Sequence, residues 1–207
     1  MMIIAIPTGR LGNQLLSYLY QKKVTSTLFE PGRLLSIKDE PNQLTFIFVK
    51  PSDVITYVER GDADVGMVGS DLLAEKNRPI YDLLDLTIGK CSLIVAGLNP
   101  KVLKQEVIQV ATKYPRLTQQ YFASKNQATE IVYLNGSVEL APLMDVADVI
   151  VDITETGKTL KDNGLTIFDT IMNVSAHVVT SRATYILKHD AVTTFITQLR
   201  RPSDATL

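Results

Sequence analysis

The sequence predicts an α/β fold of two lobes, each a β-sheet flanked by helices. Short apolar runs rich in β-branched residues alternate with segments of helical periodicity, a pattern typical of mainly parallel sheets. The alternation occurs twice along the chain, which indicates two similar halves. Because we expect the chain to cross between them near residues 85–95 and 170–180, we place the lobes at 1–88 plus 176–207 and at 89–175.

Strands of the first lobe are expected where short apolar runs occur, at 2–6, 44–49 and 64–68, with a further short strand at 33–37. Helices are expected from Leu11 to Lys22, from Pro51 to Arg60, after Gly69, and from Lys188 to Arg200. The last of these carries an apolar stripe, Val192, Phe195, Ile196 and Leu199. Segment 79–89 shows no clear periodicity.

The second lobe follows the same logic. Strands are expected at 91–96, 107–112, 129–134, 149–153 and 166–172, and helices at 114–124, 136–143 and after residue 156. A further strand, expected at 176–180, belongs to the first lobe. Glu139 falls in the first turn of the helix at 136–143, where a carboxylate complements the helix dipole; the alternative is that it faces a ligand cleft.

Composition excludes several classes of protein. The chain has 21 basic and 22 acidic residues, and this balance argues against a broad nucleic-acid or membrane-surface footprint. No apolar run approaches the length of a membrane span. One cysteine, Cys91, permits no internal disulfide and fits a reducing cytoplasm, where we expect the protein. His177 and His189 lack a ligand-like spacing, so a zinc site is not expected.

The stretch from Val149 to Gly164 predicts a phosphate site. A buried strand ends near Ile153, a turn follows, and a helix opens with Thr156 as the expected N-cap. Backbone N–H groups converge at such a turn, and the helix dipole favours an anion there. The pattern Gly-x4-Gly-Lys-Ser/Thr is absent, because no glycine stands five residues before Gly157.

Two carboxylates flank this turn, Asp152 near the end of the strand and Glu155 in the turn itself. Carboxylates are not expected beside a triphosphate, because the negative charges repel each other. A phosphate carried on a ribose suits them, because the carboxylates can accept hydrogen bonds from the 2′- and 3′-hydroxyls. An ordinary turn between strand and helix is the alternative.

A second anion site is predicted where the first strand ends. Thr8 and Gly9 place amides at a helix start, and Arg10 adds a fork of donors. Lys50 follows another strand, a position well placed for a ligand in an open α/β sheet. The alternatives are a plain turn with a solvated arginine, and a surface lysine. Arg33 points either to a cleft or to solvent.

Six stretches together resemble ATP phosphoribosyltransferase, the first enzyme of histidine biosynthesis: Thr8–Leu11, Val49–Val54, Gly61–Gly69, Ala111–Pro115, Leu134–Pro142 and Ala147–Leu160. The resemblance runs from residue 2 to about residue 200, and the last two stretches are specific to that family. It implies a fold similar to periplasmic binding proteins. The two α/β halves themselves favour an active site in the cleft between the lobes, with turn 8–12 facing turn 154–160. The resemblance also implies transfer of the phosphoribosyl group of phosphoribosyl pyrophosphate to N1 of ATP, with release of pyrophosphate and with Mg²⁺ held mainly by substrate.

The resemblance also implies roles for residues. The residues expected to bind phosphoribosyl pyrophosphate are Asp152, Glu155, Thr156, Gly157, Lys158, Thr159 and Leu160. Those expected to bind ATP are Thr8, Gly9, Arg10, Gly12, Ser70 and Asp71. Arg10, Arg33 and Lys50 are the cations expected to act in catalysis, by meeting pyrophosphate and the ATP phosphates. No protein nucleophile is needed, because the adenine nitrogen attacks directly.

The chain ends at Leu207, directly after the last expected helix, and therefore resembles the short form of the family. That form works with a regulatory subunit similar to histidyl-tRNA synthetase in a hetero-octamer. Two other functions stay open. A small-anion binding protein of the same fold would need an export signal, which residues 1–6 are too short to supply. An adaptor that only supports a partner would show no turnover.

Overall fold

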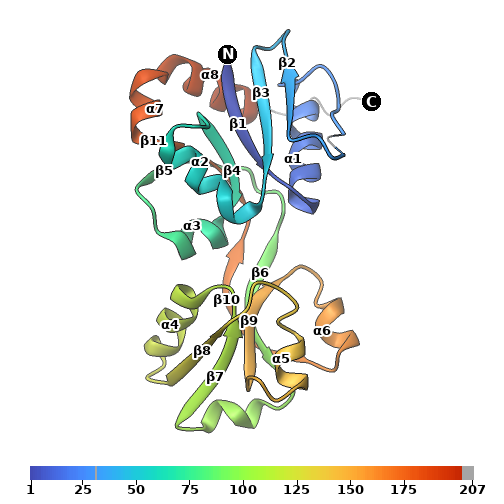
Figure 1. Ribbon diagram of the computed structural model, residues 1–207, viewed down its shortest axis with the longest axis vertical. Coiled ribbons are helices and arrows are strands. Elements are labelled where there is room, and N and C mark those ends of the chain that lie inside the picture. Colours follow the sequence, from blue (N-terminus) through green and yellow to red (C-terminus); the bar gives the residue numbers. More distant parts are fainter. Residues whose placement is uncertain (31, 202–207) are drawn as a thin grey trace. The chain divides into compact units, whose positions relative to one another are not determined.

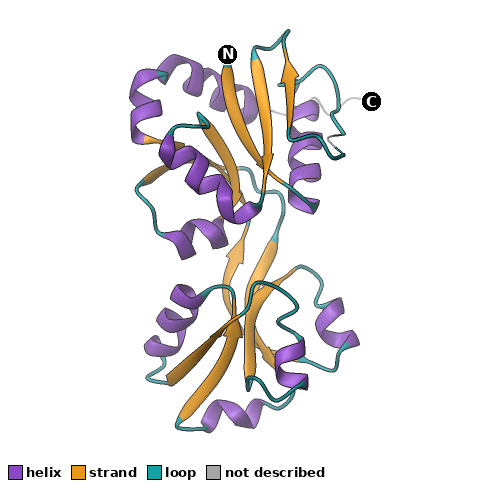
Figure 2. Ribbon diagram, in the orientation of Figure 1, coloured by secondary structure: helices purple, strands orange, loops and turns teal. Residues whose placement is uncertain are grey.

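The computed structural model describes residues 1–30 and 32–201 (Figure 1). It divides into two compact units, Met1–Gly89 with the C-terminal segment from Ser175, and Lys90–Val174. Each unit contains one β-sheet with helices packed against it (Figure 2). None of the helices in the described ranges is long and apolar enough to cross a membrane.

The first unit contains a six-stranded sheet in the order β2-β3-β1-β4-β11-β5. Its strands are β1 (Met2–Pro7), β2 (Ser36–Asp39), β3 (Leu44–Val49), β4 (Val65–Gly69), β5 (Ile80–Asp85) and β11 (Ala176–Ser181). β1 lies between β3 and β4 and is parallel to both. The carboxyl ends of these three strands therefore share one edge of the sheet.

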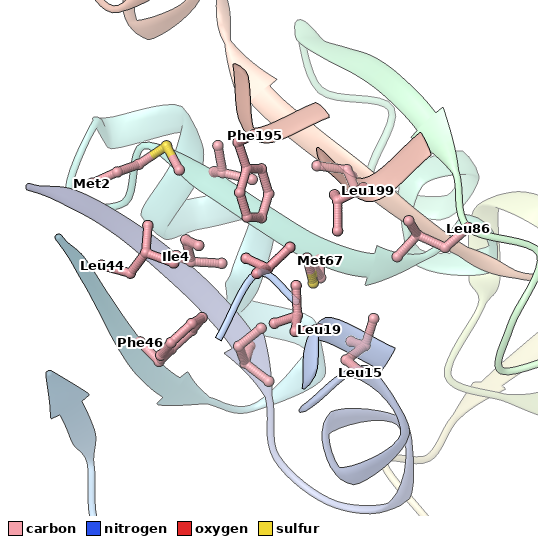
Figure 3. Packing of buried hydrophobic residues seen from close by; sticks show 14 of the residues in the cluster. Met2, Ile4, Leu15, Leu19, Leu44, Phe46, Met67, Leu86, Phe195 and Leu199 are labelled. Carbon is pink, nitrogen blue, oxygen red and sulfur yellow. The ribbon is translucent and has the colours of Figure 1, made fainter. Parts of the chain in front are cut away.

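Within the described residues, five helices pack on this sheet: α1 (Arg10–Gln21), α2 (Val54–Arg60), α3 (Ser70–Lys76), α7 (Arg182–Leu187) and α8 (His189–Arg200). A 3-10 turn at Pro51–Asp53 leads into α2. The main core forms where α1 and α8 meet the sheet (Figure 3), as Leu15, Leu19 and Phe195 pack with Phe46 and Met67 of the strands. The stripe predicted on the last helix is confirmed, since all four of its residues are buried.

Three sequence predictions for this unit are corrected. The strand expected at 33–37 begins at Ser36, so Arg33 lies in the loop before it. Segment 79–89 contains β5, whose mixed exposure at the sheet edge gives no buried apolar run to recognise. α7 was not expected, because its six residues are too short to show a helical period.

The second unit contains a five-stranded sheet in the order β10-β6-β9-β7-β8. Its strands are β6 (Cys91–Gly97), β7 (Val107–Thr112), β8 (Ala128–Tyr133), β9 (Val149–Thr154) and β10 (Thr166–Val174), and its helices are α4 (Pro115–Ser124), α5 (Leu140–Leu143) and α6 (Lys158–Asp162). β7 is parallel to both β8 and β9, so these three strands also end at one edge.

Two helix predictions for this unit are also corrected. The helix expected at 136–143 is only the four-residue α5, because Ser137 adopts a positive φ of 50° that breaks a helix there. The N-cap of α6 is Gly157 and not Thr156. Gly157 has a φ of 69°, in the left-handed region that glycine adopts without strain.

A surface ion pair joins α4 to β10. Asp169 accepts hydrogen bonds of 2.5 Å from both Lys125 Nζ and the Tyr121 hydroxyl. These bonds lower the pKa of Asp169 to about 2, and the bond from Lys125 has the larger effect. Its folded-state pKa is thus below the ordinary value, so the stabilisation is complete above that value and is lost as the pH falls toward the folded pKa.

We expect Lys125→Met to lower the free energy of unfolding by less than about 1 kcal/mol near neutral pH, since both side chains are about half exposed. The difference in the free energy of unfolding between variant and parent should decrease as the pH falls below about 4, because Asp169 becomes protonated. Urea unfolding of both proteins over a range of acid pH values measures this difference. A difference that does not change with pH would show that the charge of Asp169 does not contribute to stability.

Candidate active site

Three predicted site residues lie at the shared strand edge of the first unit. Thr8, Lys50 and Ser70 directly follow the parallel strands β1, β3 and β4. Pro7 pairs with Val49 at the end of this ladder, and the Thr8 N–H donates to the Val49 carbonyl at 2.8 Å. The structure therefore brings the turn after β1 and the turn after β3 side by side.

A pocket of about 610 Å³ opens beside the turn after β1. Its lining comes from this turn and α1, from the loop after α1, and from β3: Pro7, Thr8, Gly9, Gly12, Asn13, Leu16, Ser17, Leu28, Phe29, Glu30, Gly32, Leu34 and Phe48. The volume is in the range of small-molecule sites. The lining contains both apolar side chains, such as Leu16 and Phe48, and polar ones, such as Asn13 and Ser17.

Gly9 and Gly12 shape the pocket. Gly9 is the N-cap of α1 with a φ of 88°, and it has no side chain to bond the first N–H groups of the helix, so an anion can approach them. Gly12 lies against β1: a Cβ at this position would come within 1.9 Å of the Pro7 carbonyl oxygen. Glycine at residue 12 is therefore required for the close approach of α1 to β1.

The predicted ATP-binding residues do not all gather here. Thr8, Gly9 and Gly12 line the pocket, and five other predicted residues are absent from its described lining: Arg10, Arg33, Lys50, Ser70 and Asp71. Arg10 is the first residue of α1, and Asp71 is buried in the first turn of α3.

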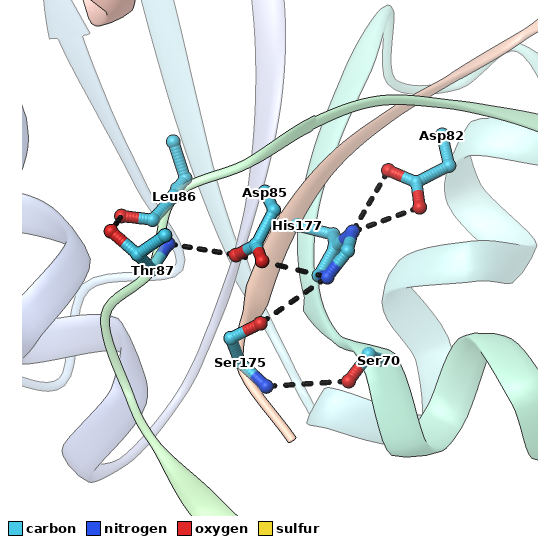
Figure 4. A network of polar contacts seen from close by, with 7 residues as sticks. All are labelled: Ser70, Asp82, Asp85, Leu86, Thr87, Ser175 and His177. Atoms are coloured by element: carbon cyan, nitrogen blue, oxygen red, sulfur yellow. Dashed lines mark hydrogen bonds and ion pairs between the residues drawn. The ribbon is translucent and has the colours of Figure 1, made fainter. Parts of the chain in front are cut away.

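Ser70 belongs to a polar network around β11 (Figure 4). The Ser70 N–H donates to the Ser175 carbonyl at 2.9 Å, and the Ser70 hydroxyl accepts from the Ser175 N–H at 3.3 Å. The Ser175 hydroxyl lies 3.3 Å from Nε2 of His177, whose Nδ1 lies 2.8 Å from Asp82. These contacts fix the start of β11 against α3, and a role of Ser70 or Asp71 in binding ATP stays a prediction.

In the second unit, the equivalent edge carries the predicted phosphate turn. Lys113, Leu134 and Glu155 directly follow the parallel strands β7, β8 and β9. Two threonines shape the turn, since the Gly157 N–H donates to Thr154 Oγ1 at 3.0 Å and the Lys158 N–H to Thr156 Oγ1 at 3.4 Å. The turn is therefore folded by its own side chains.

The helix after this turn is short. α6 has five residues, so its dipole is small, and the backbone N–H groups of its first turn are the main attraction for an anion. The Leu160 side chain is 5% exposed and packs in the core with Ile150 and Ala141. This packing anchors the helix, so the backbone of Leu160, not its side chain, is what a ligand can meet.

Asp152 lies beside this turn with 19% of its side chain exposed. Its Oδ1 accepts from the Ile153 N–H at 2.8 Å and lies 3.2 Å from Lys113 Nζ. Burial raises the pKa of Asp152, the Lys113 charge and the Ile153 N–H oppose this rise, and Glu139 adds to it. Glu139 thus influences the pKa of Asp152, one of the residues predicted to bind the ribose hydroxyls.

Lys113 is the residue that the sequence analysis missed. It lies in the stretch Ala111–Pro115, which carried part of the family resemblance, but no role was assigned to it. The signal that identifies it is the strand register: Ala111 pairs with Ile150, so residues 113 and 152 become neighbours on the same face two positions further on. Sequence alone does not give this register.

Comparison with known proteins identifies the family. A family model described as ATP phosphoribosyltransferase matches residues 50–201. The ATP phosphoribosyltransferase of Clostridioides difficile strain 630 is 44% identical over 195 residues, which cover 93% of this chain and 94% of that protein. A chain of the solved ATP phosphoribosyl transferase (HisG:HisZ) complex from Thermotoga maritima is 36% identical, with a TM-score of 0.83 and 97% of both chains covered.

A more distant match concerns the fold alone. The periplasmic aliphatic sulphonate binding protein SsuA from Escherichia coli superposes with a TM-score of 0.62 at 9% identity, covering 96% of this chain and 67% of that one. The predicted fold class, α/β and similar to periplasmic binding proteins, is confirmed. The resemblance drawn from the six sequence stretches is confirmed as well, and the chain belongs to the ATP phosphoribosyltransferase family.

Proposed function

We propose that this protein transfers the phosphoribosyl group of phosphoribosyl pyrophosphate to N1 of the ATP adenine and releases pyrophosphate, the first step of histidine biosynthesis. The observation that carries the proposal is the turn after β9. There, the N-terminus of α6 follows β9, which carries the part-buried carboxylate of Asp152, and this combination suits a phosphate attached to a ribose.

The donor substrate is assigned to the second unit. The backbone from Thr156 to Leu160 binds the 5′-phosphate, and Lys158 and Thr159 add side-chain donors. Asp152 and Glu155 accept hydrogen bonds from the ribose hydroxyls. Oδ1 of Asp152 is engaged by Ile153 and Lys113. No hydrogen bond or ion pair to Oδ2 is found among the described residues, which supports its use by a hydroxyl.

The acceptor is assigned to the pocket of the first unit. Thr8, Gly9 and Gly12 line it, and Ser70 and Asp71 are retained as weaker assignments for the nucleotide. Arg10, Arg33 and Lys50 are assigned to the phosphates of ATP and to pyrophosphate. Lys50 follows the strand next to the turn that forms the pocket, which supports its assignment.

The reaction forms a bond between adenine N1 and the anomeric carbon as the bond from that carbon to pyrophosphate breaks. The state between them has oxocarbenium character, so the protein's task is to align two polyanions and stabilise the departing charge. When bound, Mg²⁺ neutralises part of the pyrophosphate charge.

We assign Mg²⁺ to the phosphates of the substrates. Asp152 is engaged by Lys113, and no group of three or more acidic, histidine or cysteine side chains in the described ranges is placed to hold a metal. Mg²⁺ commonly binds through substrate phosphates with few protein ligands, which suits this donor set.

We further propose that the chain works with a regulatory subunit similar to histidyl-tRNA synthetase, in a hetero-octamer. The Thermotoga maritima relative, solved as a HisG:HisZ complex, supports this assembly. A cytoplasmic location belongs to the same proposal and is supported by the single cysteine.

Pyrophosphate release from ATP and phosphoribosyl pyrophosphate, measured with and without the regulatory subunit, tests the function. We expect release that requires both substrates. Binding of phosphoribosyl pyrophosphate without turnover would instead indicate a small-anion binding protein, and no turnover with the partner present would indicate an adaptor.

Two variants test how the substrates are divided. We expect Thr159→Ala to raise KM for phosphoribosyl pyrophosphate about tenfold, the effect of losing one hydrogen bond to a charged group, and to leave KM for ATP unchanged. Arg10→Ala should impair both substrates. Steady-state kinetics with each substrate varied in turn measures this, and parental kinetics in both variants would contradict the assignments.

A further inference from the structure

Lys113 and Asp152 meet on a rigid part of the second unit. Thr112, fully buried, donates from Oγ1 to the Val151 carbonyl at 2.7 Å and accepts from the Tyr114 N–H at 2.8 Å. The first bond ties the end of β7 to β9, and the second fixes the backbone that follows Lys113. The buried Tyr114 ring lies 5.2 Å from Lys113 Nζ and restricts that side chain as well.

The two oxygens of Asp152 differ in their contacts. Lys113 Nζ and the Ile153 N–H both meet Oδ1, at 3.2 Å and 2.8 Å, which fixes the plane of the carboxylate. No hydrogen bond or ion pair to Oδ2 is found among the described residues, so Oδ2 can accept from a ligand. A carboxylate held in this way presents one acceptor in a fixed direction without first having to reorganise.

We propose that Lys113 is a positioning residue, which holds Asp152 by one oxygen so that the other is presented to the ribose hydroxyls of the sugar-phosphate substrate. The inference rests on the proposed function and deepens it. Lys113 acts through Asp152 and is assigned no contact with the substrate.

The charges around Asp152 set the sign of a pH effect. Lys113 favours the ionised carboxylate, Glu139 at the N-cap of α5 opposes it, and Ile94, the partner of Asp152 in β6, is apolar. The ionised carboxylate is an acceptor only, and it binds hydroxyl groups more strongly than the neutral acid does. Removing Lys113 therefore raises the pKa of Asp152 and moves the acid limb of substrate use to higher pH.

Kinetics of Lys113→Met tests the proposal. We expect KM for phosphoribosyl pyrophosphate to rise about tenfold, the acid limb of kcat/KM for this substrate to move to higher pH, and KM for ATP to stay unchanged. Lys113→Arg, which keeps the charge, should restore most of the loss. Lys125→Met is the matched control, since Lys125 pairs with Asp169 in the same unit.

Unchanged kinetics, or equal losses for both substrates with no shift of the pH profile, would overturn the proposal. A ¹³C NMR titration of the Asp152 carboxyl, which needs no turnover, separates it from the proposed function. A higher Asp152 pKa in Lys113→Met supports the contact, and the same pKa as in the parent overturns it. Absence of pyrophosphate release by the parent would instead count against the proposed function.

Discussion

Gly12→Ala is expected to be the most damaging single substitution in the first unit. Its Cβ would lie 1.9 Å from the Pro7 carbonyl oxygen, a backbone atom that cannot rotate away, so α1 must move off β1. Overpacking of this kind costs about 1–3 kcal/mol and sometimes more. For a chain of this size, that lowers the melting temperature by roughly 2–12 °C. ATP binding should weaken in parallel, because the pocket is built on this contact.

Calorimetry and equilibrium ATP binding measure the two effects. Gly136→Ala is the control, since a Cβ at Gly136 would meet no atom within 4 Å. We expect the control to melt and bind like the parent. A Gly12→Ala variant with parental stability and parental ATP affinity would show that the close packing of α1 on β1 is not needed.

Asp152→Asn is expected to reduce use of phosphoribosyl pyrophosphate by about 10–100-fold in kcat/KM, the range for a hydrogen bond to a charged group. The amide cannot replace the charge that Lys113 pairs with, and it offers a donor where the hydroxyls need an acceptor. Use of ATP should change little, because the carboxylate is assigned to the ribose of the other substrate.

The same variant makes a prediction about pH. Burial raises the pKa of Asp152, so the parent should lose kcat/KM for phosphoribosyl pyrophosphate as the pH falls through this raised value, above the ordinary range of an aspartate. Asp152→Asn should lack that acid limb. Asp148→Asn is the control: Asp148 precedes β9, and its Oδ2 accepts from the Gln109 N–H at 2.8 Å. If kcat/KM fell at the same acid pH and by the same factor in the parent, Asp152→Asn and Asp148→Asn, Asp152 would be excluded as the group that titrates.

Much of the fold follows from short-range patterns in the sequence. The strands at 44–49 and 107–112 have the predicted bounds, because each is a short apolar run between clear breaks. The stripe on α8 is also buried as predicted, since a period of 3.6 residues is enough to define a helix face. Elements with such a local signal could be predicted from the sequence.

The remaining differences have local causes. β5 is an edge strand of mixed exposure, and α5 and α6 are too short for a period to show. Gly157 caps α6 through a positive φ, a backbone feature that side-chain capping rules do not include. Each difference thus occurs where a short element, an edge strand or a single backbone angle leaves no clear pattern in the sequence.

Some residues of the candidate site could be predicted from the sequence, and one could not. Thr8 and Lys50 were each predicted at a position suited to a ligand, because both follow buried strands, and the structure places the ends of these strands at one edge. Asp152 was predicted from its position before the turn. Lys113 was not, because its meeting with Asp152 depends on which residues of β7 and β9 are paired. The register between strands that are far apart in the sequence could not be predicted from residue types.

The central claim is that the turn from Thr156 to Leu160 holds the 5′-phosphate of the sugar donor. A crystal structure of the protein with phosphoribosyl pyrophosphate and Mg²⁺ tests it most directly. We predict the 5′-phosphate within hydrogen-bond distance of the backbone N–H groups of this turn, with a ribose hydroxyl against Oδ2 of Asp152. Density for the 5′-phosphate at any other place, with this turn unoccupied, would contradict the account.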